Sequence, residues 1–265
     1  MGTQGAVIAR LRAAGCVFAE EEAELLLAAA GTPAELDALV ERRAAGEPLE
    51  QVVGWAEFCG LRVFVDPGVF VPRRRSQFLV SVAGGLVRGR GELARPTIVD
   101  LCCGTGALGL AVGYGLAGPG LPGVELYASD LDPAAVACAR RNVEPPGGVV
   151  LHGDLFTVLP GSLRGRIDVL ICNAPYVPTS QIAFMPAEAR DHEALLALDG
   201  GTDGLAVLRR VAAEAPAWLA RGGVLLVETS ERQAPAMAAE MDSAGLAARI
   251  HDDDECGATV VTGTR

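Results

Sequence analysis

The stretch LICNAPYVP, residues 170–178, puts a carboxamide, a proline and a tyrosine directly after a short apolar run. The apolar run is typical of a buried strand, whereas the cluster of Asn173, Pro175 and Tyr176 is poor strand material. A side-chain amide beside a rigid proline and an aromatic ring can hold a planar group that forms hydrogen bonds. The pattern therefore indicates a substrate site at residues 173–176.

Three polar motifs precede this stretch, each at the end of a predicted strand. The loop in VDLCCGTG carries Gly104 and Gly106 between a strand and a helix, where backbone amides can approach a ligand closely. Asp130 ends the next strand and suits the two hydroxyls of a ribose. Asp154 ends the third strand and could accept a hydrogen bond from the exocyclic amine of adenine, with Leu155 and Phe156 against the ring.

Each motif also has a purely structural interpretation. A glycine loop is a tight turn in many folds, Asp154 could be an ordinary turn residue, and Asp130 or Asp132 could cap the helix that begins at Pro133. Asp132 fits the cap better, which leaves Asp130 for a ligand. All the motifs fall at the carboxyl ends of strands, where ligands bind in open α/β sheets.

Strand and helix patterns alternate from residue 97 onward. Strands are predicted for TIVDL, VELYASD, GVVLHGD, DVLICN and GVLLVET, with helices such as PAAVACARRN and GLAVLRRVAAEAPAWLA between them. This alternation predicts an α/β fold with a parallel sheet that is covered on both faces. The C-terminal LAARIHDDDECGATVVTGTR predicts two more strands with no helix between them, and hence an antiparallel pair at the sheet edge.

The N-terminal part predicts a small helical bundle. Three segments carry apolar residues at helical spacing, and the third begins with Thr32 as its N-cap and Glu35 three residues later. FCGLRVFVDPGVFVP predicts a β-hairpin with its turn at residues 66–68. The predicted organisation is a bundle over residues 1–55, a hairpin linker over 56–80 and the α/β domain over 81–265.

Composition excludes several function classes. A formal charge of −11 disfavours a wide grip on a nucleic-acid backbone. The seven cysteines are an odd number without a Cys-x-x-Cys motif, and histidine is scarce, so neither a disulfide framework nor a metal site is expected. The sequence shows no signal peptide and no 18-residue apolar run, which predicts a cytoplasmic protein without a membrane segment.

The order of the motifs resembles that of class I methyltransferases that use S-adenosylmethionine. NAPY resembles the Asn-Pro-Pro-Tyr signature of methyltransferases that act on amide or exocyclic nitrogens. EPLEQVVGWAEFCGLRVFVDPGVFVPR before the glycine loop and MPAEARDHEALLALDGGTDGL after the signature are similar to blocks of the HemK/PrmC family, the release factor glutamine methyltransferases. The resemblance implies a Rossmann-like, mostly parallel seven-stranded sheet with an antiparallel edge strand, plus a small N-terminal helical domain for substrate recognition.

The resemblance also implies a cofactor and residue roles. The cofactor would be S-adenosylmethionine, with S-adenosylhomocysteine as product, bound by Cys102, Cys103, Gly104, Thr105, Gly106, Asp130, Asp154, Leu155 and Asn173. The glutamine side chain in the Gly-Gly-Gln motif of a peptide-chain release factor would be received by Asn173, Ala174, Pro175 and Tyr176. Asn173 and Tyr176 would be the catalytic residues. A monomer that does not bind nucleic acid directly is expected.

The sequence departs from the family pattern at several positions. Ala174 replaces a proline, and Cys102 replaces a glycine, where a positive φ would cost energy. Residues 72–77 read Pro-Arg-Arg-Arg-Ser-Gln instead of Pro-Arg-Pro-Glu-Thr-Glu. The arginine run is either a solvated turn or an altered substrate mouth that prefers an acidic partner. The last strand also lacks the family's arginines.

These departures leave other functions open. The alternatives are an N-methyltransferase for another protein or for a small natural product, an adenine methyltransferase for DNA or RNA, and a binding module that keeps the fold without turnover. Activity on a purified release factor separates the favoured function from methylation of another protein or a small natural product. Salt-sensitive DNA binding would indicate an adenine methyltransferase. Cofactor binding without turnover would indicate a binding module.

Overall fold

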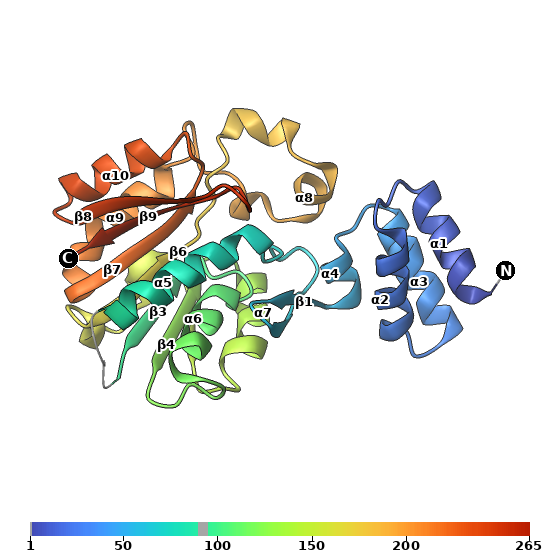
Figure 1. Ribbon diagram of the computed structural model, residues 1–265, viewed down its shortest axis with the longest axis horizontal. Coiled ribbons are helices and arrows are strands. Elements are labelled where there is room, and N and C mark those ends of the chain that lie inside the picture. Colours follow the sequence, from blue (N-terminus) through green and yellow to red (C-terminus); the bar gives the residue numbers. More distant parts are fainter. Residues whose placement is uncertain (1, 90–94) are drawn as a thin grey trace.

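The computed structural model describes residues 2–89 and 95–265. The N-terminal bundle is built from α1 (Thr3–Ala13), α2 (Ala19–Ala29) and α3 (Pro33–Ala44), and α4 (Leu49–Val53) follows it. The predicted cap of α3 is confirmed, because the Thr32 hydroxyl accepts from the Glu35 backbone N–H at 3.2 Å and the Glu35 carboxylate accepts from Thr32. The bundle has its own apolar core, separate from that of the sheet, and Figure 1 shows it beside the α/β domain.

The predicted hairpin, with its turn at residues 66–68, is wrong, and a different hairpin lies just before it in the chain. β1 (Trp55–Phe58) pairs with β2 (Leu61–Phe64) around Cys59 and Gly60, whose φ angles are 50° and 73°. Two positive φ values in a two-residue loop match the twist of the paired strands. Residues 66–68 do form a turn, closed by a hydrogen bond from Val69 N to Asp66 O at 3.1 Å, but it does not join paired strands.

The α/β domain contains a seven-stranded sheet, as predicted. Its strand order is β5-β4-β3-β6-β7-β9-β8. Within this sheet β3 to β7 run parallel, and β9 runs antiparallel to both β7 and β8. The strands are β3 (Thr97–Leu101), β4 (Glu125–Asp130), β5 (Val149–His152), β6 (Ile167–Cys172), β7 (Leu219–Thr229), β8 (Ala247–Asp253) and β9 (Ala258–Thr264).

Helices cover both faces of this sheet (Figure 1). One face is covered by α5 (Gln77–Gly89), α6 (Ala107–Ala117) and α7 (Pro133–Val143), and the other by α9 (Ala206–Trp218) and α10 (Ala234–Ser243). The two faces have separate apolar cores, since alternate residues of a strand point to opposite sides: Ile98 packs in one core and Val99 in the other.

Short helical turns complete the connections. The link from β6 to α9 holds α8 (Ala187–His192), which lies near the N-terminal bundle, where Arg43 pairs with Glu188 at 3.6 Å. The 3₁₀ turns are Arg74–Ser76, Leu155–Val158, Gly161–Leu163, Thr179–Phe184 and Leu195–Ala197. Within residues 2–89 and 95–265, no helix is long and apolar enough to span a membrane.

Candidate active site

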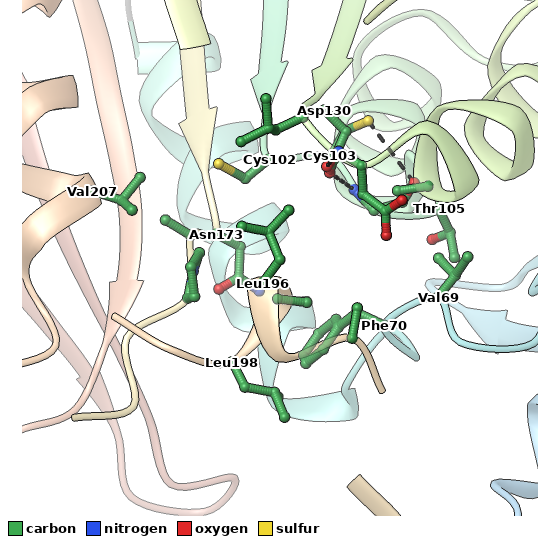
Figure 2. A pocket seen from close by; sticks show the side chains of 18 of the residues that line it. Val69, Phe70, Cys102, Cys103, Thr105, Asp130, Asn173, Leu196, Leu198 and Val207 are labelled. Atoms are coloured by element: carbon green, nitrogen blue, oxygen red, sulfur yellow. Dashed lines mark hydrogen bonds between the residues drawn. The ribbon is translucent and has the colours of Figure 1, made fainter. Parts of the chain in front are cut away.

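A cavity of about 310 Å³ lies at the carboxyl ends of β3, β4 and β6. Figure 2 shows Cys102, Asp130 and Asn173 around this cavity, together with apolar side chains such as Leu196 and Leu198. Eleven of the twelve residues predicted from the sequence line it, and Gly106 does not. A methyl group on Gly106 would lie 2.5 Å from Val143 Cγ2, so this glycine lets α6 pack against α7.

Backbone N–H groups of the glycine loop and of Asp132 hold the carboxylate of Asp130 by hydrogen bonds. Gly104 N donates to Asp130 Oδ2 at 2.8 Å, and Asp132 N donates to Asp130 Oδ1 at 2.9 Å. Burial nevertheless raises the pKa of Asp130 above its ordinary value, because desolvation outweighs these backbone donors. Cys102 has a φ of 54°, so the strain expected from replacing a glycine is present.

Asp132 caps α7, as the sequence predicted. Its Oδ1 accepts from Ala134 N at 2.8 Å, and Pro133 occupies the first turn of the helix. The carboxylate of Asp130 is therefore not needed for the cap. Each of its oxygens accepts one backbone N–H and keeps a second lone pair for a ligand.

Asp154 lies at the cavity wall in an ion pair that the sequence did not reveal. Its Oδ2 accepts from Arg210 on α9 at 2.6 Å. The side chain of Leu155 is buried in the core between the sheet and α9, and its φ is 46°. Leu155 lines the cavity, whereas Phe156 stacks on Trp218 in that core and does not line it, so the prediction that Phe156 lies against the adenine ring is wrong.

The Asn173–Tyr176 segment leaves the end of β6 and enters the cavity wall. Among the described residues, none forms a hydrogen bond with the Asn173 side chain, so its carboxamide is available to a ligand. The backbone of Pro175 and Tyr176 packs against the DGGTDG segment. A methyl group on Gly200 would lie 2.6 Å from Pro175 O, and one on Gly204 would lie 2.2 Å from Tyr176 O.

Tyr176 is fixed by two charged residues from other elements. Its hydroxyl donates to Glu228 Oε1 at 3.1 Å and accepts from Arg75, which itself donates to Glu228 Oε1 at 3.0 Å. Desolvation, followed by the charge of Glu228, raises the pKa of Tyr176 well above its ordinary value. This hydroxyl therefore remains protonated at neutral pH.

The arginine run at residues 73–75 is largely committed to partners within the chain. Arg73 donates to both oxygens of the buried Glu193 at 2.6 Å, and Arg75 is paired with Glu228. These two arginines therefore have acidic partners within the chain itself. The neighbouring Ser76 lines the cavity, is buried, and has no hydrogen-bond partner for its hydroxyl among the described residues.

Asp100 lies in the core behind the glycine loop. It is completely buried, and its Oδ2 accepts from Gly109 N at 2.8 Å. A methyl group on Gly109 would lie 2.9 Å from Asp100 Cβ, so α6 needs a glycine here to approach the strand. Desolvation raises the pKa of Asp100 to about 7.

Comparison with known proteins gives consistent results. Residues 61–242 match the family model described as "Methyltransferase small domain". The release factor glutamine methyltransferase of Streptomyces coelicolor is 38% identical over 74% of this chain and 67% of its own. A 4-amino-L-phenylalanine/4-methylamino-L-phenylalanine methyltransferase of Streptomyces pristinaespiralis is 33% identical over 85% of this chain and 76% of its own.

A solved structure shares the fold at lower identity. The Thermus thermophilus 16S rRNA N2 G1207 methyltransferase, in complex with AdoMet and guanosine, has a TM-score of 0.54 and 20% identity, over 80% of this chain and 49% of its own. The fold is that of a class I methyltransferase. The chain belongs to the methyltransferase small domain family and, within it, to the HemK/PrmC group of release factor glutamine methyltransferases.

Proposed function

We propose that this protein transfers a methyl group from S-adenosylmethionine to the side-chain amide nitrogen of a glutamine in the Gly-Gly-Gln motif of a peptide-chain release factor. The observation that carries the proposal is the carboxamide of Asn173, which has no hydrogen-bond partner among the described residues and lines one cavity with Asp130. Relatives whose names give this activity support it.

The lining residues suit the cofactor. The free lone pairs of Asp130 would accept the ribose hydroxyls, and the half-exposed Leu131 beside it offers apolar surface to a purine ring. The unpartnered hydroxyl of Ser76 would satisfy a polar group of the methionine part, since a buried hydroxyl without a partner is costly. Cys102 to Thr105 would line the methionine and ribose, with Asp154 and Leu155 at the adenine.

The reaction requires the protein to orient a weak nucleophile. An amide nitrogen is a poor nucleophile because its lone pair is delocalised into the carbonyl. When bound, S-adenosylmethionine supplies an electrophilic methyl group on a sulfonium. Asn173 Oδ1 and the Ala174 carbonyl would each accept one N–H of the glutamine amide and so direct its lone pair. Positioning of this kind can lower a barrier by roughly 7–11 kcal/mol.

Tyr176 would pack its ring on the amide plane, and its hydroxyl is held by Glu228 and Arg75. No general base is required before the transfer, because the nitrogen loses a proton readily once it becomes cationic. The histidines therefore have no assigned catalytic role.

The test is Asn173→Ala with a purified release factor and cofactor that carries a labelled methyl group. We expect kcat to fall at least about 100-fold while the cofactor Kd changes by less than about threefold. Gln181→Ala is the control, because it removes an exposed carboxamide outside the cavity lining. A mutant at Asn173 with near wild-type turnover would refute the amide-clamp role.

A second candidate is N-methylation of a small aromatic amine. It is favoured by the Streptomyces pristinaespiralis relative and by the departure from the family signature at Ala174. Parallel assays with 4-amino-L-phenylalanine and with the release factor separate the two substrates.

We also propose that the protein acts as a cytoplasmic monomer that does not bind nucleic acid. Light scattering would check the oligomeric state, and a DNA-binding titration would check nucleic-acid binding.

A further inference from the structure

A second cavity of about 470 Å³ adjoins the candidate active site. Arg75 and Tyr176 line both cavities, so they form the boundary between them. The other walls come from the end of β7, the segment that follows it, and the turn between β8 and β9. A substrate that reaches Asn173 through the first cavity would therefore have this second cavity beside it.

The lining of the second cavity is strongly acidic. It includes five carboxylates and a single guanidinium, that of Arg75, among the described residues. Because Arg75 is already paired with Glu228, the remaining carboxylates give the cavity a negative potential. They are Glu231, Asp252, Asp253 and Asp254.

Glu228 supplies an independent reason to expect a ligand here. Its side chain is only 2% exposed, and its Oε1 accepts from Tyr176 and Arg75. Its Oε2 has no hydrogen-bond partner among the described residues. A buried carboxylate oxygen without a donor is costly, so a ligand that brings N–H donors and positive charge would be favoured at this wall.

The described carboxylates of this cavity are not arranged as a metal site. Within the described part of the chain, no group of three or more His, Cys, Asp or Glu side chains is arranged to hold a metal ion. An organic cation fits this arrangement, since a guanidinium offers five N–H donors and an ammonium offers three. Carboxylates bind such groups through charge-assisted hydrogen bonds.

We propose that this acidic cavity is a substrate subsite that binds a cationic side chain close in sequence to the methylated glutamine. The proposal rests on the proposed function and deepens it, because it names a specificity element for that site. Glu228 would link the two events, since the same carboxylate holds Tyr176 and belongs to the wall of the acidic cavity.

The experiment uses short peptides that contain one Gly-Gly-Gln motif and one arginine, placed in turn from three residues before to three after the glutamine. Matched peptides carry citrulline, the neutral isostere, in place of the arginine. We expect at least one position at which arginine lowers KM about fivefold or more relative to citrulline, with kcat similar and the preference reduced at high salt.

The variant removes charge without touching the catalytic residues: Glu231→Gln, Asp252→Asn and Asp254→Asn together. We expect it to abolish the preference for arginine while the KM for the citrulline peptide is unchanged. Glu255→Gln is the control, because Glu255 is an exposed acid in the same turn that does not line the cavity. Equal KM values for both peptides in the wild type, or an equal loss in the control, would overturn the proposal.

Binding separates this proposal from the proposed function. The same peptides with the target glutamine replaced by alanine can be followed by fluorescence anisotropy, whether or not turnover occurs. Tighter binding of the arginine peptide that the triple variant abolishes supports the subsite even if no glutamine is methylated. Equal binding of the arginine and citrulline peptides refutes the subsite even if methylation of glutamine is observed.

Discussion

Gly204 is the position where a single methyl group should damage the site most directly. Its φ is 79°, and the added Cβ of Gly204→Ala would lie 2.2 Å from Tyr176 O and from Gln233 Nε2. Real Cβ contacts are essentially never shorter than 3.0 Å, so the Tyr176 backbone must move by about 0.8 Å. A displacement near 1 Å can cost about 100-fold in rate, and we expect a loss of that size in kcat.

The stability cost can be divided with a matched variant. A non-glycine residue at positive φ costs about 1–2 kcal/mol, which applies to Gly204 and to Gly245, whose φ is 85° with open space around it. Gly245→Ala should therefore lose only about 1–2 kcal/mol of unfolding free energy and keep kcat. Gly204→Ala should lose about 1 kcal/mol more, since the Gln233–Tyr176 hydrogen bond of 3.0 Å is disrupted.

The assay combines transfer of a labelled methyl group with urea denaturation of both variants. If kcat of Gly204→Ala stays within about twofold of that of Gly245→Ala, the Tyr176 backbone does not need its observed position. In that case the packing of the DGGTDG segment would have no catalytic consequence.

Two further predictions concern charged groups around the cofactor region. Arg210→Ala removes the partner of Asp154, and because both side chains are about half exposed, the cofactor Kd should rise only about two- to fivefold in a titration. Asp100 has its pKa raised to about 7 in the folded state from an ordinary value of 3.8, so the stability that its protonated form contributes is lost as pH rises from about 4 to about 7. Asp100→Asn should remove this contribution to the pH dependence, which urea unfolding of both proteins at pH 5 and pH 8 checks. The free energy of unfolding of the wild type should fall by roughly 2–4 kcal/mol more than that of the variant between pH 5 and pH 8. Equal pH dependence of the unfolding free energy in the two proteins would show that folding does not raise the pKa of Asp100.

Local sequence patterns were sufficient for most of the sheet. β3 and β6 are short apolar runs that end at polar or glycine-rich turns, and strands of this kind predict a buried parallel sheet. The same reasoning placed Asp130 and Asn173 at one edge, because parallel strands end on the same side. The prediction of the hairpin turn was wrong because Pro67 and Gly68 gave a clear turn signal, whereas the sequence at Cys59 gives no sign of its positive φ.

The partners of the site residues could not be predicted from local patterns. Arg210 is 56 residues from Asp154, and Glu228 is 52 residues from Tyr176. Arg210 lies on a helix and Glu228 lies at the end of an apolar strand. The sequence around each of them does not indicate which side chain it contacts. Such pairs depend on the tertiary arrangement of α9 and β7 around the cavity.

The alanine at position 174 can be understood from the same tertiary arrangement. A second proline would restrict the backbone locally, but this chain restrains the segment from outside. Gln233 donates to both Tyr176 O and Asp203 O, and Val177 exchanges backbone hydrogen bonds with Leu198 and Gly200. These contacts fix the segment after Pro175, and the Ala174 side chain is itself buried in the core beside the sheet. The restrained backbone around position 174 therefore keeps the geometry for methyl transfer without a second proline.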